Sequence, residues 1–188
     1  MKHLKFLIIQ TAFIGDVILA TGVIESLHAA YPSAQIDFLV RRGNEALVKD
    51  HPFIHDVIVW DKKVAKYTSM LKIILKSRAA KYDATINLQR FASSGIMTAF
   101  SGAKVKYGFD KNPLSFLFTK AFPHIISNKD EKYLHETERN FGVLQELKQV
   151  KYAKPRLYPS TADMQKVETF TLDRFITISP ASVWETKK

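Results

Sequence analysis

Short runs of apolar residues alternate along the chain with longer segments in which apolar positions recur every three or four residues. Apolar runs of this length are typical of strands that are covered on both faces of a parallel sheet, and the longer spacing is typical of helices. We predict strands at residues 4–9, 35–40, 56–60, 84–88 and 105–109, and helices at residues 16–30, 44–49, 64–80 and 93–100. This alternation indicates an α/β fold with a parallel sheet and helices on both faces.

The second half of the chain follows a different pattern. Residues 111–132 are rich in Phe and Pro and predict a loop packed under the sheet, with a ligand-binding surface as the alternative. Residues 133–148 predict a long helix, and residues 151–160, which contain two prolines, predict an interdomain linker. A helix at 162–171 and a strand at 175–179 would then open a second domain. The charged face of the long helix is predicted to be solvated and carries Glu136, Glu138, Arg139, Glu146 and Lys148.

The turn between the first strand and the first helix holds the most informative acidic residue. Asp16 is the only acid between Met1 and Glu25. It follows the carboxyl end of a buried strand, where open α/β folds bind their ligands. Asp is also a favoured helix N-cap residue, so the pattern leaves two roles open: a helix cap, or a carboxylate that takes part in chemistry.

The chain is strongly basic, with 28 Lys and Arg against 18 Asp and Glu and a net charge of +10. This charge favours an anionic partner such as nucleic acid, a phosphorylated lipid or a membrane surface. Nucleic acid is the weaker of these, because the chain has no zinc-ligand spacing, RNP-like aromatic pattern or helix-turn-helix pattern. Several cations lie near predicted strand ends, and if they converge they would form a basic lip, a positively charged rim that binds phosphate and carboxylate groups. They are Arg41, Arg42, Lys62, Lys63, Arg90, Lys104 and Lys106.

Other residue types mainly exclude functions. The chain contains no cysteine, so it has no disulfide and no thiolate metal site. The histidines at 51, 55, 124 and 135 do not combine with carboxylates at metal-ligand spacing, and we predict structural or surface roles for them. The apolar run after Lys5 is too short to span a bilayer and lacks a signal-peptide cleavage site. We therefore predict a cytoplasmic protein, with peripheral contact at the inner membrane as a further possibility.

Seven segments, in order, together resemble the ADP-heptose:lipopolysaccharide heptosyltransferases of glycosyltransferase family nine. The chain departs from the usual family pattern at Gln10, where Arg is common, and at Asn87-Leu-Gln-Arg, where Asp-Leu-Gln-Gly is common; both departures concern acceptor binding. The segments that carry the resemblance are residues 15–32, 34–40, 55–60, 82–89, 101–109, 135–140 and 176–188.

This resemblance implies an architecture of the GT-B type, with two Rossmann-like domains facing each other across a cleft. Residues 1–158 would form the acceptor-binding domain, and residues 159–188 the linker and the beginning of the nucleotide-sugar-binding domain. The chain would then be an amino-terminal fragment, inactive alone. The implied activity is inverting transfer of heptose from ADP-heptose to the Kdo/heptose inner core of lipopolysaccharide. The alternatives are a transferase of this family with another nucleotide sugar, and a non-catalytic fragment that binds anionic ligands.

The resemblance also assigns roles to individual residues. Asp16 would be the catalytic base, and neither a metal nor a cofactor would be needed. The partners would be the nucleotide-sugar donor and an anionic lipopolysaccharide acceptor rather than nucleic acid; no pattern indicates an oligomeric state. The predicted contacts to the donor diphosphate are Ser179, Ser182, Thr186, Lys187 and Lys188. The predicted contacts to the acceptor are Thr11, Gly15, Arg41, Arg42, Lys62 and Arg90.

Overall fold

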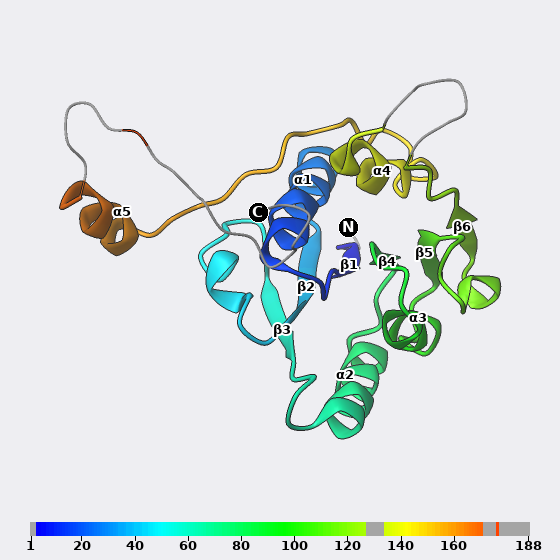
Figure 1. Ribbon diagram of the computed structural model, residues 1–188. Helices are drawn as coiled ribbons and strands as arrows, with labels where there is room; N and C mark the ends of the chain where they lie inside the picture. The colour runs from blue at the N-terminus through cyan, green and yellow to red at the C-terminus, as the bar shows by residue number, and fades with distance from the viewer. Residues whose placement is uncertain (1–2, 127–133, 171–175, 177–188) are drawn as a thin grey trace. The chain divides into compact units, whose positions relative to one another are not determined.

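A six-stranded parallel sheet forms the centre of the molecule (Figure 1). The computed structural model describes residues 3–126, 134–170 and 176. The strand order is β3-β2-β1-β4-β5-β6, and every neighbouring pair is parallel. The strands are β1 (Lys5–Ile9), β2 (Gln35–Arg41), β3 (Asp56–Trp60), β4 (Ala84–Asn87), β5 (Val105–Phe109) and β6 (Lys120–Phe122). The predicted α/β class is therefore confirmed.

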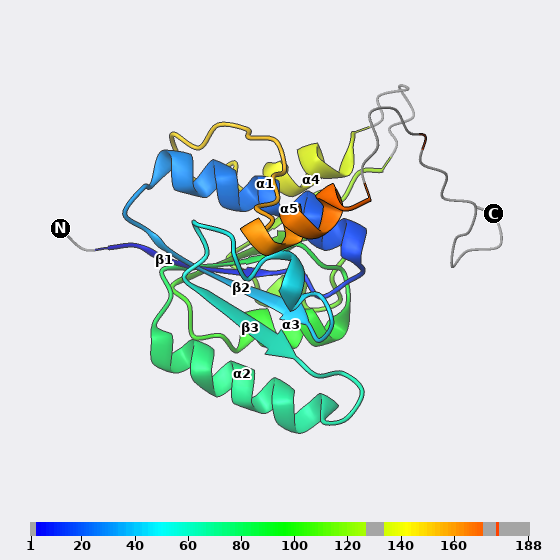
Figure 2. The same ribbon diagram turned by 90° about the vertical axis from the view of Figure 1, so that its left-hand side faces the viewer.

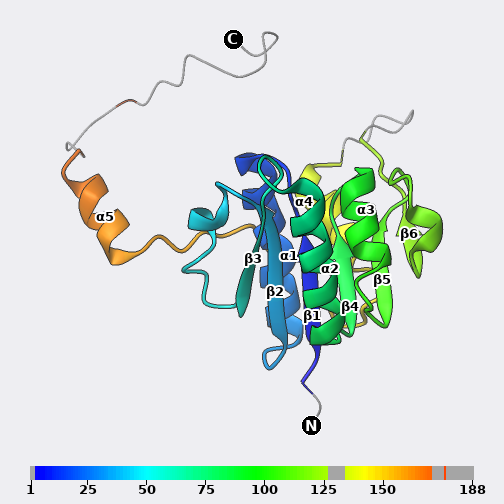
Figure 3. The same cartoon turned by 90° about the horizontal axis from the view of Figure 1, so that it is seen from below.

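Helices cover both faces of this sheet, as Figures 2 and 3 show. On one face lie α1 (Ile14–Ala30) and α4 (Glu136–Gly142), which pack against each other. On the other face lie α2 (Lys66–Ala80) and α3 (Ala92–Ala99). Short 3₁₀ turns occupy η1 (Glu45–Leu47) and η2 (Ser115–Leu117). Within the part that the structure describes, no helix is both long and apolar enough to cross a membrane.

The alternation of side chains along β1 builds a separate core on each face of the sheet. Phe6 and Ile8 pack with the apolar face of α1, whereas Leu7 and Ile9 pack on the side of α2 and α3. All four side chains are at most 2% exposed. A strand buried on both faces explains why this segment is a continuous apolar run rather than an alternating one.

The strand order reverses between β1 and β4. These two strands are neighbours, with Ile9 opposite Asn87, although 78 positions separate them in the sequence. The chain leaves β1 into α1 on one face and leaves β4 into α3 on the other (Figure 3). The carboxyl ends of the two strands therefore open into a crevice, which is where open α/β sheets bind ligands.

Residues 151–158 lie along α1 and belong to the first of two compact units, which the structure divides at 158/159. The backbone N–H of Ala153 donates to Ser26 Oγ over 3.0 Å, and that of Arg156 donates to Thr21 Oγ1 over 2.9 Å. A Cβ at Gly22 would approach the Ala153 carbonyl oxygen to 3.0 Å, so a larger residue would crowd this contact. The polar residues buried in α1 thus fasten this segment to the domain.

The second compact unit, residues 159–188, contains α5 (Thr161–Glu168). The Ser160 side chain caps this helix by accepting from the Asp163 backbone N–H at 3.2 Å. The strand predicted at residues 175–179 lies outside the described residues apart from residue 176. The roles predicted for the two domains stay predictions.

The sequence predicted five of the six strands to within one residue at each end, and it missed β6. The long helix predicted at 133–148 is wrong, since α4 spans only Glu136–Gly142. Gly142 is a poor helix former, and the turns that follow bury Val143 and Leu144 against the core. The helix predicted at 44–49 is reduced to η1. In the Phe-rich segment Phe118 and Phe122 are buried, as the packing interpretation requires, while Phe116 is 77% exposed.

A buried hydrogen bond joins the start of β4 to β2. The Tyr82 hydroxyl donates to Asp37 Oδ2 over 2.6 Å, and Asp37 also contacts His55 Nδ1 at 3.0 Å. Burial, followed by this bond and the charge of Asp37, raises the pKa of Tyr82, so the hydroxyl stays protonated and donates.

Tyr82→Phe is expected to lower the free energy of unfolding by about 1–3 kcal/mol, because it leaves a buried carboxylate without this donor. Chemical denaturation of the parent and the variant measures the difference. Tyr67→Phe is the matched control, since Tyr67 is 71% exposed and should change stability little. Equal effects of the two substitutions would show that the buried bond does not contribute.

Candidate active site

A cavity of about 460 Å³ lies in the crevice at the carboxyl ends of β1 and β4. Three helix amino-termini contribute to it, those of α1, α3 and α4, together with residues at the ends of β2 and β3. The residues that line it are Thr11, Ala12, Phe13, Asp16, Arg41, Lys62, Leu88, Gln89, Arg90, Phe91, His124, Ile126, Glu136 and Arg139. The cavity thus combines two carboxylates with three arginines, one lysine and a histidine.

Asp16 lies in the first turn of α1, with its side chain on the cavity. Of the two roles that the sequence left open for Asp16, the N-cap position does not hold: the N-cap is Phe13, and Asp16 is the third residue of the helix. Its Oδ2 atom accepts a hydrogen bond from the Phe13 backbone N–H over 3.0 Å. The carboxylate therefore satisfies a free amide at the helix amino-terminus and is held at the edge of the crevice.

The cations of the cavity are close enough to one another to interact. Lys62 Nζ donates to the Thr11 carbonyl oxygen over 2.7 Å, and burial together with the charges of Arg41 and Lys66 lowers its pKa. Burial and the charges of Arg90 and Arg139 lower the pKa of His124. Burial is the larger cause of both shifts, and the positive charge of the neighbouring cations adds to it. This electrostatic environment favours an anionic ligand.

Glu136 and Arg139 also line the cavity, so the prediction that these two residues belong to a solvated helix face is wrong. They form an ion pair at 3.7 Å within α4, and Arg139 Nη1 donates to the Leu134 carbonyl oxygen over 2.6 Å. Burial first, and then the negative charge of Asp16, raise the pKa of Glu136. The physical reason for the error is that α4 packs against α1, which turns its amino-terminal charges toward the crevice.

Buried amide side chains lie beneath the cavity. Gln10 and Asn87 are fully buried at the ends of β1 and β4, and Gln89 is 6% exposed. Gln89 Nε2 donates to Gln10 Oε1, whereas Gln10 Nε2, Asn87 Nδ2 and Gln89 Oε1 have no hydrogen-bond partner among the described residues. The two positions at which the chain departs from the family pattern, Gln10 and Asn87, are thus close neighbours, and an uncharged pair occupies them.

Most of the predicted acceptor-site residues converge on this cavity. Thr11, Arg41, Lys62 and Arg90 line it together with Asp16. Gly15 is exposed in the first turn of α1, where a Cβ would meet nothing within 4 Å.

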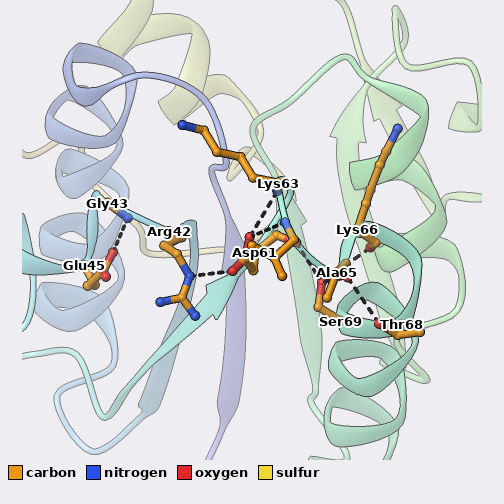
Figure 4. Close-up of polar contacts among 10 residues, drawn as sticks. Arg42, Gly43, Glu45, Asp61, Lys63, Ala65, Lys66, Thr68 and Ser69 are labelled. Atoms are coloured by element: carbon orange, nitrogen blue, oxygen red, sulfur yellow. Dashed lines mark hydrogen bonds and ion pairs between the residues drawn. The ribbon is translucent and has the colours of Figure 1, made fainter.

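Other predicted cations lie elsewhere. Arg42 forms an ion pair with Asp61 at 2.7 Å (Figure 4). Arg42 and Lys63 line a second hollow next to the cavity, and Arg41 and Lys62 border both. Lys104 pairs with Asp83 at the opposite edge of the sheet, just before β5 begins, so its predicted place in the basic lip is wrong. Lys106, inside β5, lines neither cavity. The donor contacts predicted at Ser179, Ser182, Thr186, Lys187 and Lys188 lie outside the described residues and stay predictions.

Among the titratable residues that line the cavity, sequence reasoning assigned no binding role to three: His124, Glu136 and Arg139. For Glu136 and Arg139 the signal in the sequence was the clustering of charges in His-Glu-Thr-Glu-Arg-Asn at 135–140. Within the described ranges, no group of three or more His, Cys, Asp or Glu side chains is arranged to hold a metal ion.

Comparison with known proteins identifies the class of protein that this fold and site define. The model of glycosyltransferase family 9 (heptosyltransferase) matches residues 70–188. Since this match covers more than half of the chain, the protein belongs to glycosyltransferase family 9.

Individual relatives agree with this assignment. The chain is 29% identical over 119 residues to lipopolysaccharide heptosyltransferase 1 of Campylobacter coli, covering 63% of this chain and 34% of that protein. It is 26% identical over 167 residues to lipopolysaccharide heptosyltransferase 1 of Escherichia coli K12, covering 81% of this chain and 50% of that one. The chain therefore spans between about a third and a half of the curated relatives that it matches.

Solved structures share the fold. A family 9 glycosyltransferase from Veillonella parvula matches with a TM-score of 0.75 at 20% identity, over 90% of this chain and 49% of that one. The E. coli heptosyltransferase WaaC with ADP matches with a TM-score of 0.65 at 20% identity, over 90% of this chain and 55% of that one. The described domain therefore has the fold of one half of a GT-B enzyme.

The raised pKa of Glu136 predicts a pH-dependent effect of removing its charge. The Glu136 carboxyl loses its proton at lower pH in the unfolded chain than in the folded chain. Its ionisation therefore favours the unfolded chain, and the free energy of unfolding falls as the pH rises through the folded pKa. Glu136→Gln should therefore unfold at higher denaturant concentration than the parent at about pH 7, and the difference should vanish below about pH 4.

Glu138→Gln provides the control for this experiment. The Glu138 carboxylate accepts from the His135 backbone N–H over 2.8 Å, and an amide oxygen preserves this bond, so no gain in stability is expected. If Glu136→Gln is less stable than the parent at neutral pH, Glu136 acts as an ordinary acid of a helix amino-terminus.

Proposed function

We propose that this chain is the acceptor-binding half of an inverting glycosyltransferase that transfers heptose from ADP-heptose to the inner core of lipopolysaccharide. The observation that carries the proposal is the position of Asp16 in a cavity lined by Arg41, Lys62, Arg90 and Arg139. Membership of family 9 and the lipopolysaccharide heptosyltransferases among the relatives support the reaction class.

In the proposed reaction Asp16 is the general base. Its carboxylate removes the proton from an acceptor hydroxyl as that oxygen attacks the anomeric carbon of the donor. The bond between the anomeric carbon and the diphosphate oxygen breaks, and its electron pair leaves with ADP. The hydrogen bond from the Phe13 N–H holds the carboxylate in place, because it fixes one oxygen at the helix terminus.

The cations of the cavity would bind the acceptor's anionic groups. An inner-core acceptor carries carboxylates and phosphates, and each such group that enters the cavity compensates positive charge that is otherwise unbalanced. Arg41 is further held over the Phe13 ring at 4.6 Å, at the wall of the cavity that Asp16 also lines. Binding and catalysis would therefore use adjacent residues of the same crevice.

The donor would bind residues after the described domain. The predicted contacts are the hydroxyls of Ser179, Ser182 and Thr186 with Lys187 or Lys188, which would stabilise charge on the departing diphosphate. In this proposal hydroxyls and lysines take the role that a metal ion takes in other transferases, so neither a metal nor a cofactor is required. Titration with ADP in solution tests which half of the protein binds the donor. The 188-residue chain should bind ADP weakly, and a full-length protein should bind it tightly.

We further propose that the protein works in the cytoplasm beside the membrane. The supporting argument is chemical: the donor is a water-soluble anion, whereas the acceptor is carried on a lipid, so the two meet at a bilayer surface.

Asp16→Asn in the full-length protein should reduce transfer by about 10²–10⁴-fold, because an amide cannot take up the acceptor's proton. The fold should be kept, since the amide oxygen can still accept from the Phe13 N–H. A coupled assay of ADP release measures the rate, and denaturation measures stability. Asp50→Asn, an exposed acid beside Lys49, is the control and should be as active as the parent. Near-normal turnover of Asp16→Asn would leave Asp16 with a structural role only.

Binding of an anionic sugar should raise the pKa of His124, because a nearby negative charge favours the protonated imidazole. Titration of this chain with Kdo, followed by NMR of the imidazole protons, should show the rise, and added salt should weaken binding. The neutral sugar L-glycero-D-manno-heptose should produce no such change. Arg90→Gln should weaken binding, whereas Lys104→Gln, at the other edge of the sheet, should not. Equal binding of the two sugars would contradict a role for charge.

A further inference from the structure

The outer face of α2 and the turn before it combine exposed apolar side chains with many cations. Val64 is 87% exposed, Tyr67 71%, Leu71 56% and Leu75 57%. Tyr67, Leu71 and Leu75 recur at every fourth position, so they lie along one side of the helix. We call these four residues, together with Lys63, Lys66 and Lys72, the α2 surface. Large apolar side chains grouped in this way on a domain surface indicate a binding face.

The charge of this segment is one-sided. Residues 62–81 contain seven Lys and Arg and no Asp or Glu. Lys76 reaches outside the segment to pair with Asp56 at 2.6 Å. The α2 surface therefore presents a positive potential around an apolar stripe.

The turn that leads into α2 is held in a defined shape (Figure 4). Asp61 Oδ1 accepts from the backbone N–H groups of Lys63 at 3.0 Å and Val64 at 3.1 Å, and Asp61 Oδ2 pairs with Arg42. The bond from Val64 and the neighbouring charge of Arg42 hold the pKa of Asp61 below its usual value. The nearest acid is thus engaged with the turn, while the side chains of Lys63 and Lys66 extend away from it.

We propose that the α2 surface docks on a bilayer that contains anionic lipids. Lysines around an apolar stripe match such an interface, where the cations meet headgroups and Val64, Tyr67 and the leucines enter the boundary of the acyl region. A second copy of the chain fits poorly, because a twofold contact would bring two such positive surfaces together. Nucleic acid would use the lysines but would leave the aliphatic stripe without a partner.

The position of this surface relative to the cavity gives the docking a consequence, which rests on the proposed function. Helix α2 begins directly after the carboxyl end of β3, and Lys62 at that end lines both the cavity and the hollow formed by the turn. A membrane bound at the amino-terminal part of α2 would lie beside the mouth of the cavity. An acceptor anchored in that membrane would reach Asp16 without leaving the bilayer.

Vesicle co-sedimentation of this chain tests the proposal. We expect binding to vesicles of phosphatidylcholine with phosphatidylglycerol to exceed binding to pure phosphatidylcholine by about tenfold or more. Leu71→Ser/Leu75→Ser and Lys63→Glu/Lys72→Glu should each abolish most of this binding, since both contributions are needed. Controls elsewhere on the surface, Phe116→Ser and Lys111→Glu, should bind as the parent does. Circular dichroism verifies that all variants are folded.

Further measurements separate this surface from the cavity and from self-association. Arg90→Gln, which alters the cavity, should bind vesicles normally, so failure of the proposed function would not affect this result. Release of the chain from vesicles by free glycerol phosphate would overturn the proposal, because it would show that a pocket of the protein binds a single lipid headgroup and that the α2 surface is not needed. Lipid-independent dimers that Leu71→Ser/Leu75→Ser removes, seen by sedimentation velocity, would assign the α2 surface to a second copy instead.

Discussion

The pairing of β1 with β4 is the constraint on which the site depends. Because these two parallel strands are neighbours while their following helices leave to opposite faces, the backbone cannot close over their carboxyl ends. The crevice that results receives the amino-termini of α1 and α3, and α4 joins them by packing on α1. Each of these termini brings one or two charged residues to the same place. Asp16, Arg90 and Glu136 meet there although they are far apart in the sequence.

The electrostatic balance of this crevice sets what it can bind. Two carboxylates face four cations and His124; burial first, and then the charges of neighbouring cations, lower the pKa values of Lys62 and His124. The carboxylates are not equivalent: Asp16 is held by a backbone N–H, whereas the pKa of Glu136 is raised by burial and by Asp16 itself. Such an environment suits a ligand that brings negative groups to the cations and one hydroxyl to Asp16.

Two segments outside the crevice connect the domain to its surroundings. Residues 151–158 are tied to α1 through Thr21, Ser26 and Glu25, so the chain leaves the domain from a fixed line rather than from a loose linker. On the opposite face of the sheet, the α2 surface remains exposed despite its apolar stripe. On the α1 face, residues 151–158 are hydrogen-bonded to the helix, whereas on the α2 face the apolar stripe stays exposed and can bind a partner.

The sequence by itself determined the α/β class, five strands, the positions of α1, α2 and α3, and the interest of Asp16, because apolar periodicity and strand-to-helix turns are local properties. Positions near predicted strand ends also singled out Arg41, Lys62 and Arg90, and the family resemblance assigned them to the acceptor; the structure brings all three to one cavity with Asp16. Only the tertiary structure decided that α4 is short, that β6 joins the sheet, and that Glu136 and Arg139 line the same cavity as Asp16. It also moved Lys104 to the other edge of the sheet. The physical reason is that strand order and helix packing involve residues far apart in the sequence, whereas a helix pattern shows which residues share a face but not what that face meets.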